Sequence, residues 1–194
     1  PDPKKVKEIK KDLESKGVKY IYSNWIDFLG SPKTKPMPIS DFEDLCSGKG
    51  PQFAVHSVSF VPELTPADND QIPVPDLDSL VICPWDKTCA WVFADLWWND
   101  KPYDVCPRQT LKRQIQKNAQ SDLKFYVGIE PEFFVMKWED GKPVKAIDND
   151  PIPLRRQAFG YDAEYSIDGM NFLKEIIDIL NDDLHWDLHD VVAE

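Results

Sequence analysis

Proline is the residue that most limits what this chain can fold into. The 194 residues include 17 prolines but only 8 glycines. Proline has no backbone N–H and a fixed φ, so it interrupts helices and is confined to the edges of sheets. The sequence therefore predicts short elements separated by extended segments and turns. A hydrophobic fraction of 42% and seven tryptophans still supply enough apolar surface for a folded core.

Hydrophobic periodicity predicts the elements of the first half of the chain. Val6, Ile9 and Leu13 recur at helical spacing, so we expect an amphipathic helix over residues 3–16 that stops at Gly17. Runs rich in aromatic and β-branched residues favour strands. The other expected elements are strands over 18–28, 52–62, 80–85 and 88–98, an edge segment over 29–38, a short helix over 39–50 and a long loop over 63–79.

The second half of the chain combines helical and strand patterns. The expected elements are a helix over 108–120, a strand over 126–138, a hairpin turn at Asp140–Gly141, a helix over 168–183 and a strand over 184–194. Leu111 and Ile115 are expected to face inward from the first of these helices. The change from a strand-rich to a helix-and-strand pattern suggests a domain boundary near residues 105–110.

Charge and hydropathy exclude several classes of partner. The formal net charge is -11 at pH 7, so the surface disfavours nucleic acid and anionic membranes. No apolar run reaches the roughly 18–20 residues of a membrane-spanning helix, and the N-terminus lacks the apolar region of a signal peptide. Zinc-site and disulfide spacings are missing, so reduced thiols in a cytoplasmic protein are expected at Cys46, Cys83, Cys89 and Cys106.

Two acidic residues interrupt a strongly apolar expected strand. Glu130 and Glu132 lie on either side of Pro131 within Tyr126–Trp138. Alternate residues of a strand face the same side, which would place the two Cα atoms about 7 Å apart. Carboxylates this close in an apolar setting repel each other unless a cation offsets them, and a hard divalent ion does so with oxygen ligands. The alternative is that both lie on the solvent face of a half-exposed sheet.

His185 and His189 are the other pair with metal-ligand spacing. They are four residues apart and would share a face of a helix or a strand. Metal sites in proteins need at least three protein ligands, and nothing else nearby has ligand spacing. We therefore do not expect these histidines to bind a metal.

The segment GIEPEFFV resembles the G-x-E-x-E-F motif of the glutamine synthetase family. Three earlier segments resemble family motifs in the same order along the chain: YSNWIDFLGSPKTKPMP, DNDQIPVPDLDSLVICPW and AWVFADLWWNDKPYDVCPRQTLKR. Together the matches cover residues 15–138. Several weak motifs in the right order are more specific than any one of them, so the chain is identified as a member of this family.

The resemblance implies an α+β fold with two domains. Residues 1–105 would form a β-grasp-like N-terminal domain. Residues 106–194 would form the incomplete beginning of a glutamine synthetase-type catalytic domain. The activity implied is ATP-dependent formation of a γ-glutamyl amide from glutamate and ammonia or an amine.

The resemblance also implies a set of metal ligands. Glu130 and Glu132 match the two motif glutamates that bind Mg²⁺ or Mn²⁺ in the family. A third metal-binding glutamate follows later in the family, and Glu194 is the candidate for it. The family usually has histidine immediately before that glutamate, whereas this chain has Ala193.

Three further positions bear on the amine substrate. The family's ammonium-handling aspartate follows a phenylalanine that matches Phe53, but the next residue here is Ala54. This departure resembles the branch that uses ammonia less conventionally or glutamylates amines. His56 would shape an amine pocket or be a core histidine. Asp70 matches a family aspartate that reaches a neighbouring subunit's active site, with a solvated loop residue as the alternative.

Family membership implies a homo-oligomer whose active sites form between neighbouring subunits, with the loop 63–79 at the contact. Family enzymes are more than twice this length. Most of the nucleotide pocket, the glutamate-binding residues and the arginines that neutralise phosphate are therefore expected in additional chain, and this part by itself is expected to be inactive. The alternatives are a truncated non-catalytic homologue that acts as a structural or regulatory partner in an oligomer, and an unrelated metal-binding β-protein.

Overall fold

The computed structural model describes residues 1–56, 64–146, 161, 163 and 173–191. The chain separates into two compact units, Pro1–Lys124 and Phe125–Glu194, and each is described by itself. Both helices and strands occur, so the fold is mixed α and β. Among the described residues, none of the helices has the length and apolar character needed to cross a membrane.

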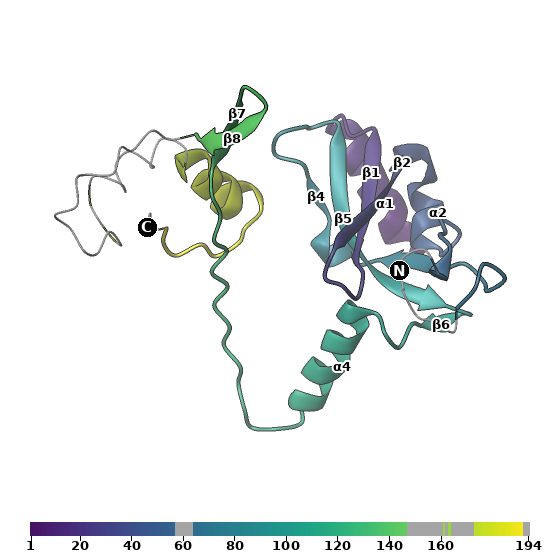
Figure 1. The fold of residues 1–194 in the computed structure, drawn as a ribbon. Coiled ribbons are helices and arrows are strands. Elements are labelled where there is room, and N and C mark those ends of the chain that lie inside the picture. Colours follow the sequence, from purple (N-terminus) through teal and green to yellow (C-terminus); the bar gives the residue numbers. More distant parts are fainter. Residues whose placement is uncertain (57–63, 147–160, 162, 164–172, 192–194) are drawn as a thin grey trace. The chain divides into compact units, whose positions relative to one another are not determined.

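A twisted six-stranded sheet organises the first unit (Figure 1). The strands are β1 Tyr20–Ile26, β2 Pro32–Pro38, β3 Ile72–Pro75, β4 Val81–Ile82, β5 Cys89–Trp98 and β6 Lys101–Pro102. β5 pairs in parallel with β1 and antiparallel with β3, β4 and β6. β2 pairs only with β1 in this order, and its prolines suit such an edge position because they donate no ladder hydrogen bond.

A buried aspartate shapes the turn between β1 and β2. The Asp27 carboxylate accepts the backbone N–H of Leu29 at 3.0 Å and of Ser31 at 2.9 Å. Gly30 has φ +80°, a conformation that favours glycine. Burial raises the pKa of the Asp27 carboxyl, but the two N–H donors and the Lys33 ammonium outweigh it, so the pKa is lower than usual.

Helices flank the first unit's sheet, and most lie where the sequence predicted them. α1 spans Pro3–Ser15, α2 spans Phe42–Cys46 and α4 spans Pro107–Asn118. The Asp2 side chain caps α1 by accepting the Lys4 N–H at 2.9 Å. Gly17, at φ +88°, follows its end as predicted. Short 3₁₀ turns occupy Ile39–Asp41 and Leu77–Ser79.

One face of the sheet is buried under α1 and α2. Ile21 of β1 and Ala90 and Val92 of β5 are fully buried there. The helices contribute the apolar side chains that cover them, namely Val6, Leu13, Phe42, Leu45 and Cys46. Because strand side chains alternate, the intervening residues of β1 and β5 point to the other face.

A second apolar cluster lies toward the end of β5. Trp25 and Leu96 are its strand residues, and Tyr103 and Cys106 pack on them from the segment before α4. The Trp25 ring stacks on the Phe53 ring, with centroids 4.2 Å apart and planes 2° from parallel. This stack holds the segment around Phe53 against the sheet.

Three predictions for the first unit are wrong. Residues 52–62 are not a strand in their described part, since Phe53 makes an isolated bridge with Gln71 and the next residues turn helical. The expected loop 63–79 contains strand β3, which reaches β5 despite its two prolines. Leu111 and Ile115 are exposed rather than inward, because α4 touches the sheet through its charged side chains.

The second unit contains the predicted hairpin. β7 Met136–Glu139 pairs antiparallel with β8 Lys142–Lys145. Asp140 and Gly141 form the tip with φ of 49° and 75°, which is the left-handed geometry of a two-residue hairpin turn. Residues 173–178 are helical and continue into a π-helical turn at Ile179–Asp183.

Two strand predictions fail in the second unit. Within the expected strand 126–138, only residues 136–138 are in a ladder, as part of β7. The described part of the final expected strand, up to residue 191, has no regular structure. Both segments are rich in β-formers, but a strand forms only where another strand supplies backbone partners. Phe172 and the end of the chain lie outside the described residues.

Gly50 offers a direct test of packing in the first unit. A Cβ at this position would lie 2.6 Å from the Leu45 Cα atom, a backbone atom that cannot move aside without distorting α2. We expect Gly50→Ala to lower the free energy of unfolding by about 1–3 kcal/mol. Urea denaturation measures the change.

Gly128→Ala is the matched control, because a Cβ there meets nothing within 4 Å. Unfolding of that variant should follow the wild-type curve. Equal stability of the Gly50 and Gly128 variants would contradict the packing described around α2.

Candidate functional site

The acidic pair lies in an extended segment of the second unit. Glu130 and Glu132 are both exposed, and neither is in a helix or a strand (Figure 1). Among the described residues, neither carboxylate forms an ion pair. The side chains around them are apolar and exposed, with Ile129 at 85% and Phe134 at 92% exposure. The pair therefore consists of two free carboxylates flanked by apolar groups, without the strand that the sequence predicted.

The hairpin next to this segment shows where ladder pairing stops. The Ala146 N–H still donates to the Val135 carbonyl at 3.0 Å, one position beyond the β7–β8 ladder. The residues before Val135, from 124 to 134, are not assigned to a strand. Pro131 would in any case contribute no N–H to a ladder.

Asp70 is held in an exposed loop of the first unit. Its neighbours are anchored on both sides: the Asn69 carbonyl accepts the Trp98 indole N–H at 2.8 Å, and Gln71 is buried beside Phe53. The Asp70 side chain itself is exposed. It is thus presented to solvent on a fixed backbone, and it belongs to a different unit from Glu130 and Glu132.

The residues around Ala54 are partly buried. Phe53 is engaged in its stack with Trp25, Val55 is fully buried, and Ala54 and His56 are half-buried. Ala54 therefore lies between two residues, Phe53 and Val55, that pack in the second apolar cluster.

The remaining metal candidates do not assemble in the described part of the chain. Glu194 lies outside the described residues. His189 is exposed and lies 3.4 Å from the Asp187 carboxylate, while His185 contacts the Asn181 carbonyl. Within residues 1–56, 64–146 and 173–191, no three His, Cys, Asp or Glu side chains converge as a metal site requires.

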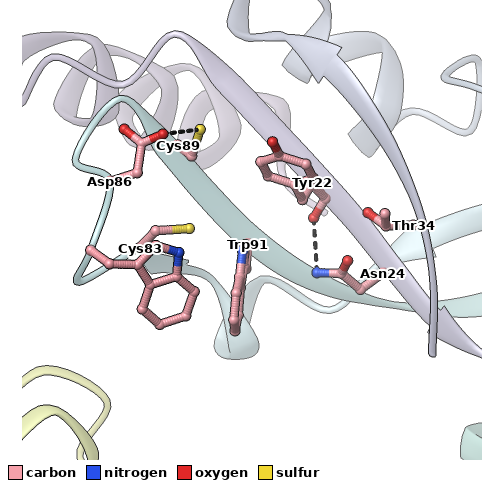
Figure 2. Close-up of a pocket in the computed structure, with 8 residues that line it drawn as sticks. Tyr22, Asn24, Thr34, Cys83, Asp86, Cys89 and Trp91 are labelled. Carbon is pink, nitrogen blue, oxygen red and sulfur yellow. Dashed lines mark hydrogen bonds between the residues drawn. The ribbon is translucent and has the colours of Figure 1, made fainter. Parts of the chain in front are cut away.

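A cavity of about 360 Å³ opens on the face of the first unit's sheet that α1 and α2 leave uncovered (Figure 2). Strands β1, β2 and β5 and the loop that follows β4 all contribute to it. Its lining residues are Tyr22, Asn24, Thr34, Cys83, Trp85, Asp86, Cys89 and Trp91. The rings of Trp85 and Trp91 meet edge to face, with centroids 4.8 Å apart and planes at 66°.

The polar groups of this cavity have defined partners. Asp86 accepts the Thr88 backbone N–H at 3.0 Å and the Thr88 hydroxyl at 2.6 Å, and its second oxygen accepts the Cys89 thiol at 3.2 Å. The Thr88 hydroxyl and the Cys89 thiol lower the pKa of the Asp86 carboxyl. The carboxylate is therefore charged at neutral pH. Cys89 raises the pKa of the Tyr22 phenol, which stays neutral.

Cys83 faces the same cavity as a neutral thiol. Burial is the main cause that raises its pKa to about 11, and the nearby Cys89 and Asp86 act in the same direction. Only thiolates are strong nucleophiles or metal ligands. Cys83 therefore contributes a small apolar surface to the cavity at neutral pH.

Four charged side chains connect α4 to the sheet. Arg108 lies 2.6 Å from Asp76 and 3.1 Å from Asp95, and Lys112 lies 3.2 Å and 2.5 Å from the same two carboxylates. Arg108 also lies over the Phe93 ring, 5.6 Å from its centroid. Burial would raise the pKa of Asp76, but its contacts with Lys112 and Arg108 outweigh burial and lower it.

The lowered pKa of Asp76 predicts a pH-dependent contribution to stability. The charged form is favoured in the folded state, so its contribution is present above the ordinary value of 3.8 and is lost as pH falls through the lower folded pKa. At neutral pH, Asp76→Asn should be less stable than wild type by about 1 kcal/mol, a modest value because the site is partly exposed. The difference should shrink below pH 3.8, as measured by urea denaturation.

Asp78→Asn is the control for this experiment. Asp78 is exposed, two residues along, and the variant keeps the backbone N–H that donates to Asp76. Its stability should match that of wild type at both pH values. A difference between Asp76→Asn and wild type that persisted unchanged into acid would contradict the ionic role of Asp76.

Sequence reasoning missed both the cavity and the charged network. The signal for the cavity is the alternation of Cys89, Trp91 and Phe93 with the buried residues of β5, which marks a second face rich in aromatic groups. The signal for the network is weaker, since Asp76 and Arg108 are 32 residues apart along the chain.

Comparisons with known proteins match this chain to one family. Residues 104–194 match the family model for the glutamine synthetase catalytic domain. Glutamine synthetase of Rhizobium meliloti (strain 1021) is 32% identical over 165 residues, which are 85% of this chain and 36% of that protein. Glutamate–methylamine ligase of Methyloversatilis universalis is 29% identical over 147 residues, 75% of this chain and 33% of that protein.

Solved structures agree with this in fold. Apo GmaS without ligand superposes with a TM-score of 0.75 at 22% identity, covering 96% of this chain and 42% of that one. A GmaS complex with ADP gives 0.73 at 23% identity, covering 95% and 41%. The chain thus spans about a third of the length of the curated relatives it matches.

Proposed function

Because this chain belongs to the glutamine synthetase family, we propose that it is part of an ATP-dependent ligase that joins glutamate to ammonia or an amine through a γ-glutamyl amide. The observation that carries the proposal is the pair Glu130 and Glu132, which lies inside the segment that matches the catalytic-domain model. Relatives named as glutamine synthetase and as glutamate–methylamine ligase support this class of reaction.

The chemistry of the two glutamates fits a hard divalent cation. Both carboxylates are exposed and free of ion pairs among the described residues, and oxygen donors are what Mg²⁺ and Mn²⁺ take. Glu194 is proposed as the third ligand. In such a reaction a bound divalent ion supplies neutralisation of phosphate charge, with ATP as the phosphoryl donor to the glutamate side chain. Glu130 and Glu132 would hold the divalent ion in a fixed position.

The proposed architecture follows the same family. Residues 1–105 would form a β-grasp-like domain, which the parallel β1–β5 pairing beside the β1–β2 hairpin supports. Residues 106–194 would begin the catalytic domain. In the proposed homo-oligomer, the loop 63–79 of one subunit would close the active site of its neighbour and present Asp70 to it. The exposure of Asp70 on a fixed backbone is compatible with that role.

The metal assignment predicts the effect of removing one carboxylate. In the intact protein expressed from its gene, Glu132→Ala should lower metal-dependent ATP turnover by about 100-fold or more, since even the loss of an outer-shell partner costs a metal site about 10–100-fold. Turnover with glutamate and an amine is measured across a range of Mn²⁺ concentrations. Partial recovery at high Mn²⁺ is expected, because weakened coordination is offset by mass action.

Glu139→Ala is the matched control for that variant. Glu139 is an exposed glutamate of β7, where it pairs with Lys137 at 2.8 Å. It should keep wild-type turnover. Wild-type turnover by Glu132→Ala would contradict the metal assignment. Absence of ATP turnover in the intact wild-type protein would favour the alternative of a non-catalytic homologue.

The amine preference is testable at Ala54. We expect wild type to use methylammonium, and Ala54→Asp to shift the ratio of kcat/KM toward ammonium, because the added carboxylate favours a compact, fully hydrogen-bonding cation. Ala67→Asp, at an exposed loop position, adds the same charge elsewhere and should leave the ratio unchanged. Steady-state kinetics with ammonium and methylammonium measure the ratio of kcat/KM for each variant. An unchanged ratio in Ala54→Asp would exclude a role for this position in amine choice.

A further inference from the structure

We propose that the cavity on the face of the β1–β5 sheet opposite α1 and α2 binds a small alkylammonium ion. All eight of its lining residues lie within Pro1–Lys124, so the site is separate from the proposed metal ligands and does not depend on the ligase reaction. Four observations carry the inference: the shape of the cavity, its aromatic walls, its single charge and the spare acceptor capacity of that charge.

Two tryptophans make the apolar walls. Trp85 and Trp91 meet at 66°, so their planes form a corner rather than a flat stack. Tyr22 is the register partner of Trp91 on the adjacent strand and adds a third ring to the same face. Figure 2 shows Trp91 in the middle of the lining residues, with Tyr22 and Asn24 on β1 beside it. Aromatic faces attract organic cations through the negative charge of their π systems.

The charge of the lining has one sign. Among the lining residues that the structure describes, Asp86 is the only ionised side chain, and none is Lys, Arg or His. An anion or a phosphate would therefore find no basic partner here. The formal charge of the whole chain, -11, adds to the attraction of cations.

Asp86 retains capacity for a further donor. One of its oxygens accepts both Thr88 groups, while the other accepts only the Cys89 thiol, a weak donor. Each carboxylate oxygen has two lone pairs, so the second oxygen can take one more hydrogen bond or face a cation. The Asn24 amide nitrogen donates to the Tyr22 carbonyl at 3.2 Å, so the Asn24 amide oxygen remains as another acceptor.

The size of the cavity selects an organic cation over a bare metal ion. A volume of about 360 Å³ is far larger than a metal ion requires. The described residues also supply no set of three His, Cys, Asp or Glu ligands there. A cation with methyl groups fits within such a space and can place its positive charge against both the rings and Asp86.

Choline chloride is the probe, and the seven indole N–H signals of the ¹⁵N-labelled chain are the readout. At constant ionic strength kept with sodium chloride, the Trp85 and Trp91 signals should shift and saturate with a millimolar Kd. The Trp138 and Trp186 signals, from exposed tryptophans of the second unit, should not shift. The neutral isostere 3,3-dimethylbutan-1-ol should bind at least about tenfold more weakly.

Two variants test the groups involved. Asp86→Asn keeps an oxygen for Thr88 but loses the charge, and it should weaken choline binding about fivefold. Asp68→Asn is its control, because Asp68 accepts the N–H and hydroxyl of Thr65 in the same manner outside the cavity. Trp85→Leu should weaken binding about tenfold, and Trp85 is 61% exposed, so the fold tolerates its loss.

Three results would overturn the proposal. The first is the absence of saturable shifts at Trp85 and Trp91. The second is equal binding of choline and its neutral isostere, which would make the cavity an apolar site. The third is wild-type affinity in Asp86→Asn, which would show that the carboxylate takes no part.

Discussion

The hydrogen-bonded ladder of β5 is the interaction on which the rest of the first unit depends. This ten-residue strand pairs with β1, β3, β4 and β6, so each neighbouring strand is positioned by it.

The alternation of side chains along β5 divides the unit into two faces. Ala90 and Val92 enter the core under α1 and α2, while Cys89 and Trp91 line the cavity on the opposite side. A slip of one residue in the β1–β5 register would exchange the two sets, because side chains alternate with a period of two. The core and the cavity therefore constrain each other.

The sequence predicts those elements whose signals are local. The α1 helix, its stop at Gly17, the long strand β5 and the hairpin at Asp140–Gly141 all carry their determinants within a few residues, and the structure confirms them. β3 could not be predicted in the same way. Its IPVP segment resembles a loop because of its prolines. It becomes a strand because β5 offers partners that lie between 19 residues (Pro75–Ala94) and 25 residues (Ile72–Trp97) further along the chain.

The acidic segment illustrates the opposite error. Tyr126–Trp138 has high β-propensity, yet the β7–β8 ladder begins only at Met136, and large apolar side chains before it remain exposed. Propensity describes fitness for a pleated, half-buried surface and does not supply the neighbouring strand. The identity of Glu130 and Glu132 as candidate ligands followed from residue type, spacing and motif order, which need no tertiary contact. Their environment depends on contacts between distant parts of the chain, and for that reason sequence reasoning could name the residues but not their surroundings.

The charged network fixes the orientation of α4 on the sheet of the first unit. The helix buries none of its residues, and Leu111 and Ile115 face solvent, so apolar packing does not fix it. Arg108 and Lys112 instead each contact both Asp76 and Asp95, which lie on the segment after β3 and on β5. Two cations shared by two carboxylates restrict rotation of the helix more than a single pair would, because each contact excludes different orientations. Burial of these charges carries a desolvation cost, which the paired contacts outweigh at Asp76 and Lys112. The point from which the chain continues toward Glu130 is thus set by electrostatics, and it should be more sensitive to acid than the apolar core beneath α1 and α2.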